Sequence, residues 1–301
     1  GETGGGKYVW WTVTHEILHG LGLAHPHDKG GGSTRTASAY KALDNEMYTV
    51  MSYEGARGYQ KAYGHALTPM ALDIAALQAM YGTNTQKNDG ASSYRLTDPE
   101  TAAVVGDDDA VVIGRAYYAI WDAGGTDTMS YTGDHSVVIN LNSATLGEPG
   151  SNGLTKLINQ VKSSDIWRSR GELDRGPGSG GAKTLKHDFN PNYHAGGFFS
   201  RVMIMKNGEY EGVDGGFSIA NGAKIENAVG GGQQDLLIGN HLGNVLSGKD
   251  GNDFLFGANG ADQLAGQAGQ DTLYGGAGRD NLYGGNGDDR LIGHNGNDGI
   301  H

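Results

Sequence analysis

Cysteine is absent from this chain of 301 residues. Disulfide bonds are therefore excluded, and so are the thiolate-ligated zinc sites of zinc fingers. Basic residues are also scarce, because 22 Lys and Arg stand against 34 Asp and Glu and give a net charge of −12. Such an acidic chain argues against a nucleic-acid partner and favours bound cations.

Long apolar runs are missing as well. No stretch of 18 apolar residues occurs, so we expect no transmembrane helix, and no signal-peptide pattern is visible. Glycine, in contrast, is abundant at 54 residues, far above the usual share of about 7%. An excess of this size indicates either disorder or a repeat that depends on glycine.

A motif near the amino terminus reads HEILHGLGLAH, which is H-E-x-x-H-x-x-G-x-x-H. On a helix, His15 and His19 lie on one face, one turn apart, with Glu16 beside them. Gly22 can take a positive φ, which ends the helix and brings His25 back as a third ligand. Three histidines with an open fourth position predict a catalytic zinc site rather than a structural one.

We expect the zinc helix to run from about residue 8 to residue 21 and to end before Pro26. The residues predicted to form its buried apolar stripe are Val13, Ile17, Leu18, Leu21 and Leu23.

A turn containing methionine follows at residues 49–53, which we call the Met-turn. Met51 lies 26 residues after His25, and in metzincins such a turn forms the floor of the zinc site. Tyr53 is placed to approach the metal from the side. A second helix is predicted over residues 68–82, with Thr68 as its N-cap, Pro69 in the first position and Gly82 at its end.

Short β-like runs fill the middle of the chain. We expect strands at residues 102–105, 111–113, 117–121, 137–141, 202–205 and 217–219. Carboxylates among glycines, as in the turn of Asp122 and Asp127, are how oxygen ligands are presented to calcium. The triple aspartate at residues 107–109 is a weaker candidate, and residues 147–200 are predicted to form an irregular surface insertion.

A nine-residue repeat accounts for the glycine. Residues 230–301 divide into eight units, each beginning with Gly and seven of them carrying Asp at the sixth position. This is the calcium-binding pattern G-G-x-G-x-D-x-U-x, in which U is a large aliphatic residue. It predicts a roll of two parallel sheets with two units per turn, unfolded without calcium. The aspartates predicted to stack along its two edges are Asp235, Asp253, Asp271 and Asp289 on one, and Asp262, Asp280 and Asp298 on the other.

The extended zinc motif, Pro26, the Met-turn and the nonapeptide repeats together resemble the serralysin family, which are secreted bacterial metzincin peptidases of the repeats-in-toxin class. The resemblance covers residues 8–146 and 197–301. It implies that His15, His19 and His25 hold one catalytic zinc ion. Glu16 would be the general base that takes a proton from the zinc-activated water and passes it to the leaving amine. Tyr53 would be a fifth ligand that swings away and hydrogen-bonds the tetrahedral intermediate.

The resemblance also implies several structural calcium ions. The implied ligands outside the repeats are Asp122, Gly124, Gly125, Asp127 and Glu226, with Asn88, Gly90 and Ser92 as further ligands of the same site. We therefore expect an extracellular, monomeric protein that acts on protein or peptide substrates and neither binds nucleic acid nor spans a membrane.

The fold class implied is α+β. We expect a zinc catalytic domain of metzincin type at residues 1–82, a β-rich connecting region at 83–229 and the calcium-binding β-roll at 230–301. Only fourteen residues precede His15, whereas the family carries a long segment there that builds the upper half of the cleft. The chain also stops within a repeat, so the expectation is a processed, cleaved or incompletely represented protease.

Three functions compete. The favoured one is a secreted, calcium-stabilised zinc endopeptidase with Glu16 as general base. The second is a calcium-binding β-roll attached to a catalytically impaired peptidase remnant, and the third is a zinc hydrolase acting on a non-peptide amide.

Overall fold

The computed structural model describes residues 5–26, 46, 48–53, 65–97, 110–112, 116–133, 135–144, 201–206, 209–214 and 216–301. The expected strand at 102–105, the triple aspartate at 107–109 and the insertion at 147–200 lie outside the described residues.

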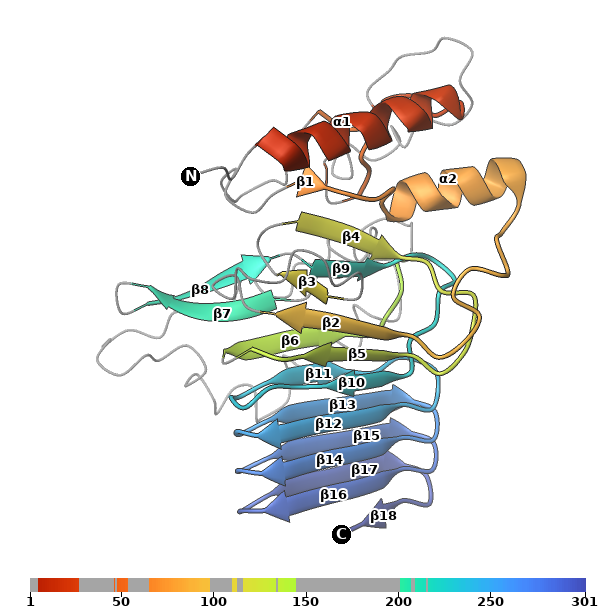
Figure 1. Cartoon of the computed structure of the whole chain (residues 1–301). Coiled ribbons are helices and arrows are strands. Elements are labelled where there is room, and N and C mark those ends of the chain that lie inside the picture. Colours follow the sequence, from red (N-terminus) through yellow and green to blue (C-terminus); the bar gives the residue numbers. More distant parts are fainter. Residues whose placement is uncertain are drawn as a thin grey trace.

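Two helices occupy one end of the molecule and a stack of strands extends away from them (Figure 1). The helix α1 spans Gly5–Gly20 and α2 spans Ala71–Tyr81. A three-stranded parallel sheet lies next to the helices, in the order β1 (His65–Ala66), β4 (Ala116–Ile120) and β9 (Gly216–Ile219).

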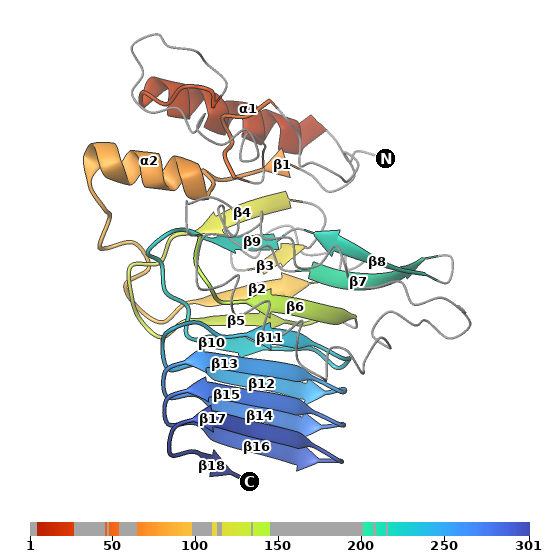
Figure 2. The same cartoon turned by 180° about the vertical axis from the view of Figure 1, so that it is seen from behind.

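Two larger sheets run through the rest of the described chain and lie face to face (Figure 2). The eight-stranded sheet has the order β18 (Gly299–Ile300), β16 (Asn281–Asn286), β14 (Gln263–Ala268), β12 (Val245–Asp250), β10 (Asn227–Val229), β5 (Thr128–Tyr131), β2 (Ser93–Thr97) and β3 (Ala110–Val112). The seven-stranded sheet has the order β17 (Arg290–Asn295), β15 (Thr272–Ala277), β13 (Phe254–Asn259), β11 (Leu236–Ile238), β6 (Ser136–Asn140), β7 (Arg201–Lys206) and β8 (Glu209–Asp214).

The parallel roll predicted from the repeats is confirmed. Val245 pairs with Gln263 and Gln263 with Asn281, so neighbouring strands of one sheet are 18 residues apart and one turn uses two units. Both sheets continue beyond the repeats, because β10 pairs with β5 and β11 with β6. The expected boundary at residue 230 therefore marks a change in sequence pattern across which the sheets run without a break.

The core between the two sheets is a ladder of aliphatic side chains from the eighth position of each unit. Six of them are completely buried, namely Leu237, Leu246, Leu255, Leu264, Leu273 and Leu282. Each such leucine stabilises the fold by about 1.5–3 kcal/mol. Because consecutive strands contribute to alternate sheets, the ladder also joins the sheets to each other.

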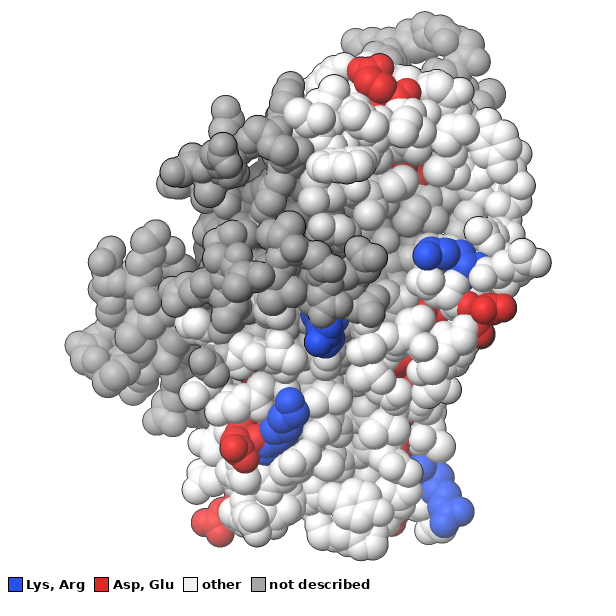
Figure 3. Space-filling model, viewed as in Figure 1, with Lys and Arg blue, Asp and Glu red and all other residues white. Residues whose placement is uncertain are grey.

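The outer faces of the two sheets differ. On the seven-stranded sheet, the outward side chains of Phe256 and Tyr274 are only 6% and 9% exposed, and their rings stack at 4.8 Å. On the eight-stranded sheet, Val245 and Tyr283 are 47% and 44% exposed. Across the described part of the face in Figure 3, Lys and Arg form separate groups rather than a basic stripe, in keeping with the acidic composition.

The buried side of the zinc helix agrees only in part with the predicted stripe. The structure buries Trp11, His15 and Leu18, whereas Val13 and Ile17 are 42% and 57% exposed. Of the predicted stripe, Leu18 and Leu23 are therefore buried as expected, whereas Leu21 is exposed like Val13 and Ile17. The side of α1 that carries His15 faces the Met-turn and α2. The periodicity of apolar residues within the helix does not specify this contact.

The start of α2 also differs from the prediction. Met70 is the N-cap, and Asp73 accepts a hydrogen bond from its backbone N–H at 2.8 Å. Thr68, the predicted cap, instead accepts a hydrogen bond from the backbone N–H of Ala119 in β4 at 2.9 Å. Gly82 ends the helix with φ of 87° as predicted. Neither described helix is long and apolar enough to cross a membrane.

Candidate metal sites

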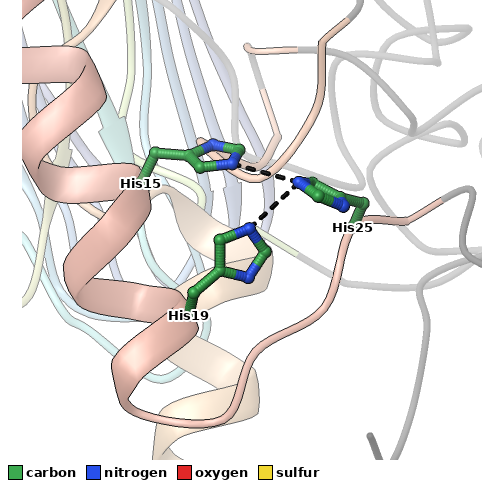
Figure 4. Close-up of side chains that lie close together, drawn as sticks. All are labelled: His15, His19 and His25. Atoms are coloured by element: carbon green, nitrogen blue, oxygen red, sulfur yellow. Dashed lines mark hydrogen bonds between the residues drawn. The ribbon is translucent and has the colours of Figure 1, made fainter. Parts of the chain in front are cut away.

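Three histidine rings converge at the carboxyl end of α1 (Figure 4). His15 and His19 project from the helix, and His25 returns toward them from the loop that follows Gly22, whose φ is 95°. The Nε2 atom of His25 lies 3.1 Å from Nε2 of His15 and 3.0 Å from Nε2 of His19. The structure thus brings together the three residues that the sequence motif predicts.

The opposite nitrogens of two rings are held by backbone carbonyls. Nδ1 of His15 lies 2.9 Å from the carbonyl oxygen of Val50, and Nδ1 of His19 lies 2.9 Å from that of Leu23. A carbonyl oxygen can only accept, so each Nδ1 carries the proton and each Nε2 presents its lone pair to the centre of the cluster. Burial lowers the pKa of His15, which favours the neutral form that ligates metals.

This donor set fits a zinc ion. Among the described residues, these are the three histidine or acidic side chains whose ligand atoms all lie within 4.8 Å of one another. Zn–N bonds of about 2.0–2.1 Å in a tetrahedron place the nitrogens roughly 3.3 Å apart, so the observed spacing needs only a slight expansion.

The other predicted residues of the site surround the histidines. Glu16 is exposed on α1 next to His15, and its charge opposes the lowering of the His15 pKa. The ring of Tyr53 packs against His15 and His25, with centroids 5.4 and 4.6 Å away, and is 61% exposed. Met51 is buried in the apolar cluster beneath, with Trp11 and Leu18. The catalytic roles of Glu16 and Tyr53 remain predictions.

The predicted calcium ligands outside the repeats are also neighbours. Asp127 accepts a hydrogen bond from the backbone N–H of Ser92 at 2.7 Å, and its own N–H donates to Glu226 at 2.9 Å. The Oδ2 atom of Asp127 is buried and has no hydrogen-bond partner among the described residues. Burial raises the pKa of Asp127 to about 6. A buried carboxylate oxygen of this kind is what a cation would satisfy.

The loops that hold this carboxylate cluster touch closely. A Cβ added to Gly125 would lie 2.5 Å from the carbonyl oxygen of Gly90, and the backbone N–H of Gly124 donates to Asp122 at 3.0 Å. Asn88 donates from its side chain to the hydroxyl of Tyr94 at 3.1 Å. The assignment of this cluster to calcium remains a prediction.

The carboxylates of the repeats stack along two edges of the roll as predicted. Oδ1 of Asp253 accepts the backbone N–H of Asp235, and Oδ1 of Asp280 accepts that of Asp262 in the other stack. The second oxygens of Asp253, Asp262 and Asp280 are buried and accept no hydrogen bond from the described residues. They point at the first glycine of their own unit, where any Cβ would overlap them. Buried carboxylate oxygens that lack a hydrogen-bond donor and lie against glycine backbone are suited to bind calcium.

Two residues of these sites were not predicted. Tyr94 donates a hydrogen bond of 2.6 Å from its hydroxyl to Asp122, and burial raises its pKa. Asp73 is buried beneath the Met-turn. Tyr94 and Asp122, like Asp73 and the Met-turn, are separated by more than twenty residues in the sequence. No local sequence pattern therefore reveals either contact.

Comparison with known proteins supports the calcium-binding repeats and finds relatives among bacterial metalloproteases. The family model for the RTX calcium-binding nonapeptide repeat (4 copies) matches residues 242–273 and 266–300. Metalloprotease AprA of Pseudomonas entomophila is 32% identical over 254 residues, which cover 80% of this chain and 39% of that protein. Serralysin C of Dickeya chrysanthemi is 36% identical over 157 residues, covering 49% of this chain and 31% of the relative.

A serralysin of Proteus mirabilis is similar too, at 33% identity over 179 residues, or 55% of this chain and 34% of the relative. The chain therefore spans between about a third and two fifths of the length of these relatives. Its repeats indicate calcium binding, and its matches extend well beyond them toward the histidine cluster. By these matches, the chain is similar to the serralysin family of metalloproteases over most of its own length.

Proposed function

We propose that this chain carries the zinc centre of a secreted, calcium-stabilised endopeptidase that hydrolyses peptide bonds in proteins. The observation that carries the proposal is the convergence of three Nε2 atoms while two of the opposite Nδ1 atoms are held by carbonyls. In this proposal residues 1–82 supply the zinc site, residues 83–229 connect it, and residues 230–301 form the calcium-dependent roll.

In the proposed reaction, each residue of the site has its own role. His15, His19 and His25 hold one zinc ion, which when bound polarises the scissile carbonyl and lowers the pKa of the attacking water. The carboxylate of Glu16 takes the proton from that water and delivers it to the nitrogen of the leaving amine. The hydroxyl of Tyr53, beside His15 and His25, donates a hydrogen bond to the oxyanion of the tetrahedral intermediate.

Substitution of the general base tests the mechanism. Glu16→Gln should leave zinc binding intact and lower casein hydrolysis by about 10²–10⁴-fold, because the amide cannot accept the proton. Asp250→Asn, which neutralises an exposed carboxylate of β12 in the roll, is the matched control and should retain activity. Removal of zinc by a chelator should abolish hydrolysis by the unaltered chain. Full activity of Glu16→Gln would refute the role of this residue.

The same assay separates the competing functions. Zinc and calcium binding without hydrolysis of any peptide would favour a β-roll module with an impaired peptidase remnant. Hydrolysis of non-peptide amides, with casein left intact, would favour a zinc hydrolase of another specificity.

A further inference from the structure

Asp73, in the first turn of α2, is almost completely buried at 2% exposure. Its carboxylate accepts three hydrogen bonds, from the hydroxyl of Thr49 at 2.5 Å, the backbone N–H of Val50 at 2.8 Å and the backbone N–H of Met70 at 2.8 Å. The bond to Met70 caps the helix. The other two go to the Met-turn and contribute nothing to the helix, so the capping role alone does not account for this residue.

The bonds to the Met-turn lead to a histidine of the zinc site. The hydroxyl oxygen of Thr49, which donates to Asp73, accepts the backbone N–H of Met51 at 3.1 Å. That N–H belongs to the same peptide group as the carbonyl of Val50, which accepts the Nδ1–H of His15 at 2.9 Å. A continuous path of hydrogen bonds therefore joins the carboxylate to the ring of His15.

We propose that Asp73 is a positioning residue for His15, which acts by fixing the Val50–Met51 peptide so that its carbonyl holds Nδ1–H and directs Nε2 to the zinc ion. This inference rests on the proposed function of the histidine cluster.

The charge of Asp73 strengthens the path. Burial raises its pKa to about 6, while the hydrogen bonds from Thr49, Val50 and Met70 hold it down, so the group is ionised above that pH. An ionised carboxylate polarises the hydroxyl of Thr49, and hydrogen bonds in such a chain strengthen one another. A more negative carbonyl on Val50 then makes the Nε2 of His15 a better donor to metal.

The test uses the full chain with calcium and measures zinc affinity by competition with a chromogenic chelator. Asp73→Asn and Thr49→Val should each weaken zinc binding by about 10–100-fold, the usual effect of removing a partner behind a ligand. Thr49→Ser keeps the hydroxyl and should bind zinc as tightly as the unaltered chain. The visible spectrum of the cobalt-substituted protein should shift in the two weakened variants only.

Leu77→Ala provides the structural control, because Leu77 of α2 packs against the same apolar cluster. It should lower the melting temperature and leave zinc affinity within about twofold. If Asp73→Asn fails to fold, the Thr49→Val and Thr49→Ser pair decides the question. Unchanged zinc affinity in Thr49→Val, or an equal loss in Leu77→Ala, would overturn the inference while leaving the proposed function in place. Failure of the unaltered chain to bind zinc would overturn both.

Discussion

At the scale of single residues, the roll depends on glycines that touch the backbone of the preceding turn. Gly278 has φ of 142°, and a Cβ there would overlap the carbonyl oxygen of Gly260, 18 residues earlier. The obstacle is backbone, which cannot rotate away as a side chain would. The fourth position of the repeat is therefore a steric requirement as well as a conformational one.

Gly278→Ala should accordingly lower the free energy of unfolding by about 2–4 kcal/mol, through combined strain and overpacking. Gly232→Ala is the control, because a Cβ there meets nothing within 4 Å, and it should change stability by less than about 0.5 kcal/mol. Urea unfolding in saturating calcium measures both. Equal stabilities of the two variants would contradict the close approach.

At the scale of elements, the two sheets share one repeat but have different outer faces. Tyr274 in β15 and Tyr283 in β16 both occupy the ninth position of their units, yet they are 9% and 44% exposed. Tyr274 stacks on Phe256 and His294, whereas Tyr283 stacks on His301 at 4.8 Å. The sheet to which a unit belongs therefore determines how far its ninth side chain is buried and how much that side chain contributes to stability.

This asymmetry gives a matched pair of substitutions. Tyr274→Ala should cost about 3 kcal/mol of stability, as large-to-small changes at buried aromatic positions do, and Tyr283→Ala less than about 1 kcal/mol. Thermal unfolding with calcium present compares the two. A larger loss for Tyr283→Ala would show that the outer faces are not buried as described.

The sequence predicted best what is local or periodic. The helix of His15 and His19, the turn at Gly22 and the 18-residue register each follow from spacing within one segment. It predicted the burial of Leu18 but could not specify that Val13 and Ile17 would be exposed, because the neighbours of α1 are the distant Met-turn and α2. Asp73 was missed for the same reason, since its bonds to the Met-turn depend on how two distant segments pack.

At the scale of the whole molecule, the stacked carboxylates make the roll sensitive to pH and calcium together. Burial raises the pKa of Asp253 to about 8 and the pKa values of Asp235 and Asp262 to about 7, against an ordinary 3.8. Raised folded-state pKa values mean that the neutral carboxyls stabilise the calcium-free roll fully below about pH 4. This contribution is lost as the pH rises through 7 and 8.

The calcium-free chain should therefore melt at a progressively lower temperature between pH 5 and pH 8, and its roll should be unfolded at the upper end. Calcium binds the ionised carboxylates, so its stabilising effect should grow over the same interval. Calorimetry and circular dichroism of the full chain, with and without chelator, follow both trends. A calcium-free melting temperature that rises with pH, or β-structure indifferent to chelator at pH 8, would contradict the prediction.

The alternation of strands between two sheets restricts how the roll can change in length. Phe254 pairs with Thr272 in one sheet, and Gln263 between them belongs to the other. Removing nine residues ahead of Tyr283 would transfer every later strand to the opposite sheet. Tyr283 would then lie on the outer face of the seven-stranded sheet, where Tyr274 is buried. Removing eighteen would leave every remaining strand in its own sheet. The roll can thus be shortened or extended without repacking only by whole turns, although its sequence repeats every half turn.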